Sequence, residues 1–209
     1  VDAIKEMGIA NARGVGVLRP DVSDTDLKRL DEGGIRGIRF TVGDPKTAVV
    51  SIDMIEPLAK RIAAYGWHIQ LNMPYDKIVE HADMLRRLPT PVVFDHLGKP
   101  PEEEGVKHPS HAVIRGMLDQ RKAWVKISGA YMNTRVGPPT YADATLVAQA
   151  FVKAAPERLV WGSDWPHPSP NIKPDDAVLF DLLTTWVPNE TTRNRILVDN
   201  PQELYGFPK

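Results

Sequence analysis

Asp164, His96 and Arg39 each lie at the end of a short apolar run, and their side chains suit hydrolytic chemistry. A carboxylate can take a proton from water, an imidazole can polarise a carbonyl or hold an oxyanion, and a guanidinium can bind a carboxylate or sulfonate through two hydrogen bonds. The three residue types predict hydrolysis of an activated ester, with Asp164 and His96 catalytic and Arg39 binding substrate. Each also has a structural interpretation: Asp164 could begin an Asx turn, and His96 could be a buried hydrogen-bonding group.

Five further polar side chains fall at or just after strand ends and are predicted to bind substrate. They are Asn72, Ser128, Tyr131, Arg135 and His167. In a parallel α/β barrel the chemistry gathers at the carboxyl ends of the strands, so polar residues at successive strand ends favour one shared pocket. Arg135 could equally be a solvated charge in its glycine- and proline-bounded loop.

Three other polar residues lie within the apolar runs or at their ends. Side chains alternate along a strand, so Asp95 is predicted to point away from His96 and to anchor the scaffold. His68 shares a strand face with Asn72 and is expected deep in the interior or at its bottom rim. Lys126 either extends from the base of the sheet or pairs with an interior carboxylate.

No complete metal or cofactor motif occurs. The sequence has no H-x-H, no H-E-x-x-H and no cysteine, so we expect no tightly bound metal and no required cofactor. A single divalent ion such as Zn²⁺ would need donors beyond His96 and Asp164. The absence of G-x-S-x-G argues against a serine hydrolase, and neither phosphate-binding glycine fingerprint is present.

The elements that position these residues alternate between strand and helix. Short runs rich in valine and isoleucine predict strands buried on both faces of a parallel sheet. The predicted strands are 13–18, 35–42, 67–73, 91–95, 123–128 and 159–162. Helices are predicted from Ser23 to 33, over 51–65 and 76–88, from about 109, and over 141–155, 175–186 and 190–198.

Six strand–helix units in one domain, residues 1–209, predict a TIM-type (β/α)₈ barrel that lacks its first two units. Residues 1–8 read as the end of a helix, which agrees with two units preceding the chain. The alternative is a six-stranded open sheet.

The composition limits the partners. Lys plus Arg number 26 and Asp plus Glu 27, giving a net charge of −1, so no nucleic-acid partner and no anionic membrane surface are expected. No apolar run approaches the length of a membrane span and no signal peptide is evident, so the prediction is a cytoplasmic protein. A homo-oligomer formed through exposed barrel edges is a further expectation.

Four stretches resemble the amidohydrolase-2 branch of the amidohydrolase superfamily, in particular its pyrone-dicarboxylate and related lactone hydrolases. They are G-G-I-R-G-I-R-F at 33–40, F-D-H-L-G-K-P at 94–100, W-G-S-D-W-P-H-P at 161–168 and N-P-Q-E-L-Y-G at 200–206. The resemblance implies a (β/α)₈ barrel that opens a small anionic lactone without a required metal. It implies that Asp164 activates water, that His96 polarises the lactone carbonyl, and that Arg39 binds a substrate carboxylate.

Two departures from the pyrone-dicarboxylate pattern favour a different lactone. A second arginine expected in the stretch 41–46 is missing, and Asn72 stands where that group has tyrosine. Two alternatives stay open: a metal-dependent decarboxylase of the same superfamily, and a catalytically incompetent barrel fragment.

Overall fold

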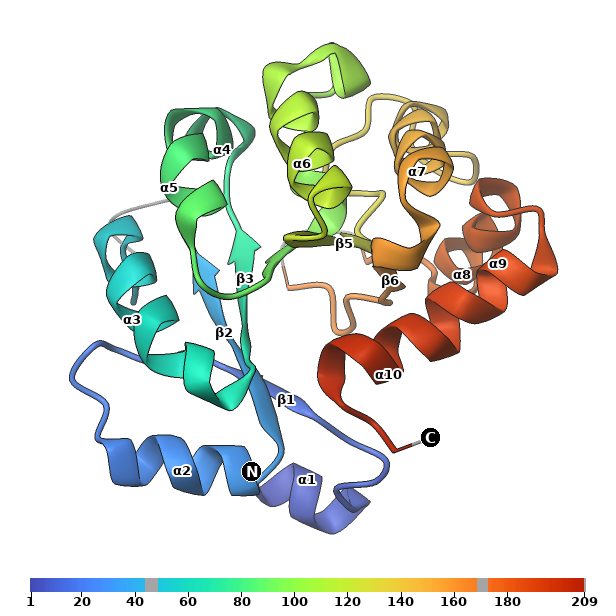
Figure 1. The fold of residues 1–209 in the computed structure, drawn as a ribbon. Coiled ribbons are helices and arrows are strands. Elements are labelled where there is room, and N and C mark those ends of the chain that lie inside the picture. The colour runs from blue at the N-terminus through green and yellow to red at the C-terminus, as the bar shows by residue number, and fades with distance from the viewer. Residues whose placement is uncertain (44–48, 169–172, 209) are drawn as a thin grey trace.

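Six parallel strands form one curved sheet, with most of the helices arranged around its outer side (Figure 1). The computed structural model describes residues 1–43, 49–168 and 173–208. The strands are β1 (Gly14–Gly16), β2 (Ile35–Thr41), β3 (His68–Asn72), β4 (Val92–Phe94), β5 (Ala123–Ile127) and β6 (Leu159–Trp161). Each lies within one of the predicted runs.

The strands pair in sequence order from β1 to β6, and every pair is parallel. A doubly wound sheet reverses its strand order at a switch point, whereas a barrel sheet continues in one direction. The sheet therefore has the architecture of a TIM-type barrel with six strands present, as the sequence predicts. Among the described residues, β1 and β6 are the edge strands, and each pairs with a strand on one side only.

Most helices follow the predicted positions, although several are shorter and the last one, after residue 198, was not predicted. They are α1 (Asp2–Met7), α2 (Asp24–Glu32), α3 (Ile55–Ile62), α4 (Tyr75–Glu80), α5 (Ala82–Arg87), α6 (Pro109–Asp119), α7 (Ala142–Ala154), α8 (Asp176–Trp186), α9 (Glu190–Asn194) and α10 (Asn200–Tyr205). The predicted helix 76–88 is broken at His81 into α4 and α5, and a π-helical turn, Arg195–Asp199, joins α9 to α10.

Local sequence explains where several helices begin and end. The Ser23 hydroxyl accepts from the Asp26 backbone N–H at the start of α2, as an N-cap residue does. Pro109 at the first position of α6 needs no hydrogen-bond acceptor for its nitrogen. After α3, Gly66 adopts a left-handed φ of 68° and turns the chain into β3.

Two apolar layers pack against the sheet. The larger layer lies between the strands and the outer helices and includes Ile38, Phe40 and Trp67, all fully buried. A smaller layer of Val93, Trp124 and Val160 packs against Leu204 and Tyr205 of α10. Val93 pairs with both Gln70 and Trp124, and Val160 pairs with Lys126. Gln70 and Lys126 line the cavity described below, so the smaller layer lies on the inner face of the curve.

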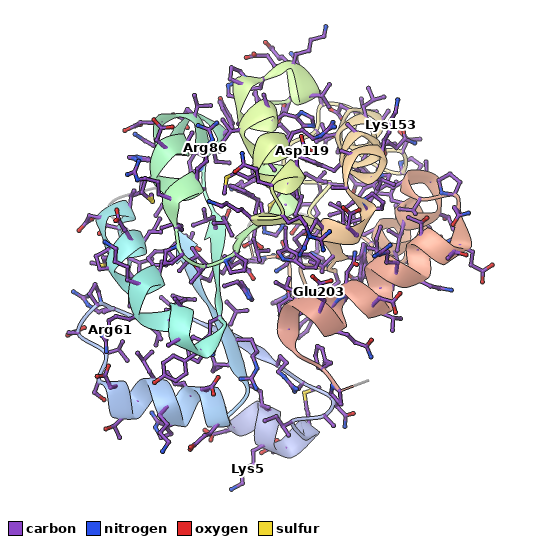
Figure 2. The ribbon with its side chains drawn as sticks, viewed as in Figure 1. Lys5, Arg61, Arg86, Asp119, Lys153 and Glu203 are labelled. Atoms are coloured by element: carbon purple, nitrogen blue, oxygen red, sulfur yellow. The ribbon has the colours of Figure 1, made fainter. Side chains whose placement is uncertain are left out.

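Charged side chains on the helices lie at the periphery of the molecule, as Lys5, Arg61 and Lys153 do in Figure 2. Charged residues on the inner face of the sheet are therefore exceptions that call for an explanation. Within the described ranges, no helix has both the length and the apolar character needed to cross a membrane.

Candidate active site

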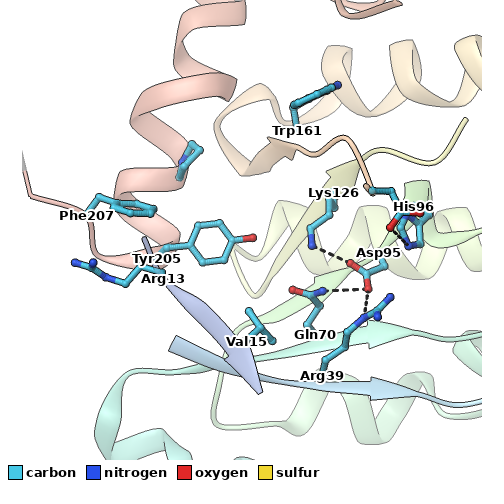
Figure 3. Close-up of a pocket in the computed structure, with 12 residues that line it drawn as sticks. Arg13, Val15, Arg39, Gln70, Asp95, His96, Lys126, Trp161, Tyr205 and Phe207 are labelled. Atoms are coloured by element: carbon cyan, nitrogen blue, oxygen red, sulfur yellow. Dashed lines mark hydrogen bonds and ion pairs between the residues drawn. The ribbon is translucent and has the colours of Figure 1, made fainter. Parts of the chain in front are cut away.

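A cavity of about 460 Å³ opens on the inner face of the sheet (Figure 3). The predicted residues Arg39, His96 and Asp164 line it together, although they come from the ends of β2, β4 and β6. The opposite wall is formed by the C-terminal segment, with Tyr205 and Phe207. The prediction of one shared pocket at the strand ends thus holds for these three residues.

Asp164 and His96 face each other, with 3.7 Å between Asp164 Oδ1 and His96 Nε2. On the other side of the imidazole ring, Nδ1 lies 3.0 Å from the Ser128 hydroxyl oxygen. If that hydroxyl donates to Nδ1, the ring proton sits on Nε2 and points toward Asp164 and the cavity. The contact with Ser128 holds the imidazole ring of His96 in this orientation.

Asp164 does not use its carboxylate in a local Asx turn. Its backbone has a left-handed φ of 63°, and the Tyr131 hydroxyl donates to Asp164 Oδ2 at 2.5 Å. Behind Tyr131 lies His167, whose Nδ1 is 3.3 Å from the Tyr131 hydroxyl oxygen and whose Nε2 is 2.9 Å from Asp176 Oδ1. One carboxylate oxygen of Asp164 is thus held, and the other faces His96.

The expectation that Asp95 points away from the site is wrong. Asp95 is buried and lines the cavity beside His96. Strand β4 ends at Phe94, and the alternation that puts Val93 on the inner face also puts Asp95 there. Residues His96 to Lys99 then all have positive φ, and this left-handed turn brings His96 back to the same cavity.

Asp95 anchors the scaffold, as predicted, through three partners on the inner face (Figure 3). Arg39 Nε donates to Asp95 Oδ2 at 2.9 Å, Gln70 Nε2 donates to the same oxygen at 3.1 Å, and Lys126 Nζ lies 3.2 Å from Oδ1. Of the two alternatives for Lys126, pairing with an interior carboxylate is therefore correct. The Arg39 side chain remains accessible to a ligand in the cavity, since it is 34% exposed.

The charges around Asp95 and His96 fix their protonation states in opposite ways. Burial alone would raise the pKa of Asp95, but the positive charges of Lys126, of His96 in its protonated form and of Arg39 outweigh it and hold that pKa below its ordinary value. Burial lowers the pKa of His96 despite the neighbouring Asp95 and Asp164 carboxylates. At neutral pH the site therefore combines an ionised Asp95 with a neutral imidazole.

Three remaining sequence expectations have mixed outcomes. Asn72 lies beside the site, where Lys99 Nζ donates to its Oδ1 at 3.2 Å. Arg135 does not line the cavity; its exposed guanidinium pairs with Glu103 Oε1 at 2.9 Å. The stretch 41–46, where a second arginine was expected, lies partly outside the described residues. The substrate-binding roles of Asn72, Ser128, Tyr131, Arg135 and His167 stay predictions.

Lys99 and Asp176 were not singled out from the sequence. Lys99 is half-buried, and burial together with the positive charge of Arg39 lowers its pKa. Its position three residues after His96 in the D-H-L-G-K-P stretch was the available signal. Asp176 gave no signal, because an acidic residue in the first turn of a helix is ordinary.

The donor set does not suit a catalytic metal ion. Within the described ranges no three histidine or carboxylate side chains come together in a geometry that could hold one. His96 and Asp164 supply two donors, whereas Asp95 already pairs with Arg39 and Lys126.

The arrangement combines a held carboxylate, a neutral imidazole and an excess of positive charge. The cavity lining carries three cations, Arg13, Arg39 and Lys126, against the two carboxylates of Asp95 and Asp164. Such a lining can bind a small anion and can place a water molecule between a base and a hydrogen-bond donor. The fold and site thus define a barrel hydrolase with its chemistry at the strand ends.

Comparison with known proteins gives the family. Residues 3–207 match the Amidohydrolase family model, and the chain belongs to this family of hydrolytic enzymes. It is 34% identical to a 2-pyrone-4,6-dicarboxylate hydrolase of Comamonas testosteroni, covering 98% of this chain and 70% of that protein. It is 30% identical to a 4-sulfomuconolactone hydrolase of Rhizobium radiobacter, covering 99% of this chain and 70% of that protein.

A solved structure agrees with the family assignment. The apo structure of an Agrobacterium tumefaciens protein superposes with a TM-score of 0.87 at 30% identity, covering 98% of this chain and 73% of that one. The resemblance expected from the four sequence stretches is therefore confirmed.

Proposed function

We propose that this protein hydrolyses a small anionic lactone, with Asp164 as the general base. The observation that carries the proposal is the placement of Asp164, held by Tyr131 and facing His96 across a cationic cavity. The names of the relatives support a lactone with a carboxylate or sulfonate group. Arg39 lines the cavity together with Asp164, and Lys99 lies close enough to both for their charges to interact, so these two cations would bind that anionic group.

In the proposed reaction water attacks the lactone carbonyl carbon while Asp164 takes one of its protons. His96 donates a hydrogen bond from Nε2 to the carbonyl oxygen as negative charge develops there. The tetrahedral intermediate then collapses, the ring carbon–oxygen bond breaks, and the leaving oxygen receives the second proton of the attacking water, while Asp164 keeps the first proton until it is released to solvent. The product is an open-chain compound with a new carboxylate.

No cofactor enters this reaction, so we propose that none is required. A divalent ion such as Zn²⁺ would need a donor in addition to His96 and Asp164. The metal-dependent decarboxylase alternative gains no support from the donors in the described ranges, for the same reason.

The test is turnover of a panel of carboxylated and sulfonated lactones, followed by acid release in a weakly buffered pH-indicator assay. Asp164→Asn should lower kcat by about 100-fold or more, because it removes the base but keeps the shape. Asp119→Asn, on the exposed side of α6, is the matched control and should keep wild-type activity. Circular dichroism checks that each variant is folded.

Two results would contradict the proposal. One is the absence of turnover with every lactone tested, which would favour the catalytically incompetent alternative. The other is an Asp164→Asn variant as active as the wild type.

A further inference from the structure

A line of hydrogen bonds runs from Asp164 to the surface, away from the cavity. Tyr131 links Asp164 to His167, and His167 links Tyr131 to Asp176 at the first position of α8. The proposed reaction uses only the Asp164 end of this line. The side chain of His167 is 4% exposed and that of Asp176 is 51% exposed, so the line begins in the site and ends at solvent.

Among the described residues, the two ring nitrogens of His167 make their polar contacts with Tyr131 and Asp176. The Tyr131 and His167 rings meet edge to face, with 5.4 Å between centroids. Lys173 contributes a cation nearby by donating to the His167 backbone carbonyl. Tyr141, at the start of α7, lies close enough to Tyr131 for their charges to interact. Asp164 and Asp176 are the two carboxylates at the ends of the line.

Counting protons along the line shows what it can do. When Asp164 is ionised, Tyr131 donates to it, and a neutral His167 with its proton on Nε2 donates to Asp176. Adding one proton gives two arrangements. In the first the proton is on Asp164, which donates to Tyr131, and Tyr131 donates to His167 Nδ1. In the second Tyr131 again donates to Asp164, and His167 is an imidazolium.

These two arrangements contain the same atoms and the same number of protons. They differ by the shift of one proton from Asp164 to the Tyr131 oxygen and of the Tyr131 proton to His167 Nδ1. Burial and the Asp164 carboxylate raise the pKa of Tyr131, so its hydroxyl stays protonated at neutral pH and can both give and receive a proton. The imidazolium form is stabilised by the Asp176 carboxylate at 2.9 Å.

We propose that Tyr131, His167 and Asp176 form a proton relay that accepts from Asp164 the proton taken from water. The relay rests on the proposed function in one respect, namely that Asp164 is the general base. It returns Asp164 to its ionised form during turnover and supplies a path for the proton to solvent at Asp176. Tyr131 and His167 act through Asp164 and are positioning residues, with roles separate from substrate binding.

The two links of the relay differ in length, and the difference identifies the step that has to tighten. The Tyr131–Asp164 contact is short at 2.5 Å, whereas His167 Nδ1 lies 3.3 Å from the Tyr131 oxygen. With a neutral His167, Nδ1 presents a lone pair to an oxygen whose proton is turned toward Asp164, so no strong bond forms there. Proton transfer to Asp164 frees the Tyr131 proton for Nδ1, and the second contact can then shorten.

Nuclear magnetic resonance tests the relay without any substrate. The full chain is labelled with ¹⁵N in histidine and ¹³C in aspartate, and His167→Gln assigns the imidazole signals. One proton that enters the line is shared between Asp164 and His167, so the Asp164 carboxyl signal and the His167 Nδ1 signal should change together over the same pH range. In Tyr131→Phe the ring packing remains but the hydroxyl is gone, so the His167 signals should no longer follow the titration of Asp164.

Kinetics supplies the second readout. Asp176→Asn keeps a hydrogen-bond acceptor for His167 Nε2 but removes the charge that stabilises the imidazolium. It should lower kcat by about tenfold, equivalent to one pKa unit of lost stabilisation, and leave KM within about twofold. Asp175→Asn is the matched control, because Asp175 caps the same helix by accepting from Ala177 N–H and asparagine is an equally good cap.

The outcomes separate the relay from the general-base assignment. His167 signals that stay constant through the Asp164 titration would overturn the relay even if lactone turnover is found. Turnover that is equal in Asp176→Asn and Asp175→Asn would overturn it too. Coupled signals that are lost in Tyr131→Phe would support the relay even if no lactone in the panel is hydrolysed, a result that would count against the proposed function alone.

Discussion

His68 is a titratable residue that is buried and makes no ion pair with a described side chain. It is 1% exposed on the inner face of β3, and neither ring nitrogen makes a hydrogen bond of good geometry with a described group. The centre of the Tyr205 ring lies 5.5 Å from the centre of the His68 ring. On β2, only glycine at position 37 leaves room for the imidazole, because a Cβ on that residue would lie 2.5 Å from His68 Nε2. Burial, reinforced by the charge of Lys126, lowers the pKa of His68 to about 4.

This lowered pKa predicts a loss of stability in mild acid. Between the ordinary value of 6.5 and about 4, the unfolded chain binds a proton at His68 and the folded chain does not. The free energy of unfolding should therefore fall as pH drops below 6.5, by up to about 1.4 kcal/mol per pH unit from this residue. Urea denaturation at pH 7 and pH 5 measures the change. Between these two pH values the free energy of unfolding of His68→Gln should fall by about 2 kcal/mol less than that of the wild type. Equal losses in the two proteins would show that His68 is not the cause.

At the scale of an element, the turn after β4 explains how one short strand presents two neighbouring residues to the same cavity. Four successive residues, His96 to Lys99, adopt left-handed backbone angles, and three of them are not glycine. Such angles cost roughly 1 kcal/mol for each non-glycine residue and persist only when the surroundings enforce them. Here the turn holds His96 against the loop after β5, where Gly129 lies directly beside the imidazole.

Gly129→Ala should therefore damage the site more than its backbone conformation alone would. The new Cβ would lie 2.7 Å from His96 Nδ1, which forces the ring away from Ser128. Gly137 is the matched control, because its φ of 70° is similar to the 66° of Gly129 and a Cβ there meets nothing within 4 Å. Both alanine variants should lose about 1 kcal/mol of stability from the left-handed angle.

Only Gly129→Ala should lose a further 1–3 kcal/mol from overpacking. It should also lose at least tenfold in kcat, if an imidazole held by Ser128 is required for the general acid–base chemistry. Thermal unfolding and lactone turnover of the two variants give the comparison. Similar losses in both would mean that His96 does not depend on this contact.

Elements were more predictable from the sequence than the site they build. Each strand was located because it is apolar on both faces, and Ser23 and Gly66 marked helix boundaries through their own local chemistry. The period-two argument for Asp95 failed because it assumed that the strand continues through His96, and a left-handed turn at a non-glycine residue leaves no sequence signature. The sequence left two interpretations of Arg135 open because nothing local decides whether a loop arginine faces a cavity or pairs with a surface carboxylate such as Glu103.

At the scale of the whole molecule, the C-terminal segment ties the two ends of the sheet together. From the β6 side, Asn200 Nδ2 donates to the Leu159 carbonyl at 2.6 Å, and Arg158 pairs with Glu203 at 3.0 Å. On the β1 side, Arg13 Nη2 donates to the Gly206 carbonyl at 2.6 Å. Residues 200–207 thus form one wall of the cavity and connect strands that do not pair with each other (Figure 1).

Arg13 should therefore contribute to the stability of the whole chain. Its guanidinium also lies 4.8 Å from the centre of the Phe207 ring, so one side chain makes a charged hydrogen bond and a cation–π contact to a segment 193 residues away. Arg13→Met keeps most of the apolar stem but loses both contacts, which should lower the free energy of unfolding by about 1–2 kcal/mol. Arg19→Met, in the exposed loop that follows β1, is the control and should change the free energy of unfolding by less than about 0.5 kcal/mol.

Urea denaturation measures the free energy of unfolding of both variants. Carboxypeptidase digestion under native conditions should release residues 207–209 faster from Arg13→Met than from Arg19→Met. If both variants unfold and digest alike, Arg13 is dispensable, and the apolar packing of Leu204 and Tyr205 against β4, β5 and β6 is enough to hold the C-terminal segment.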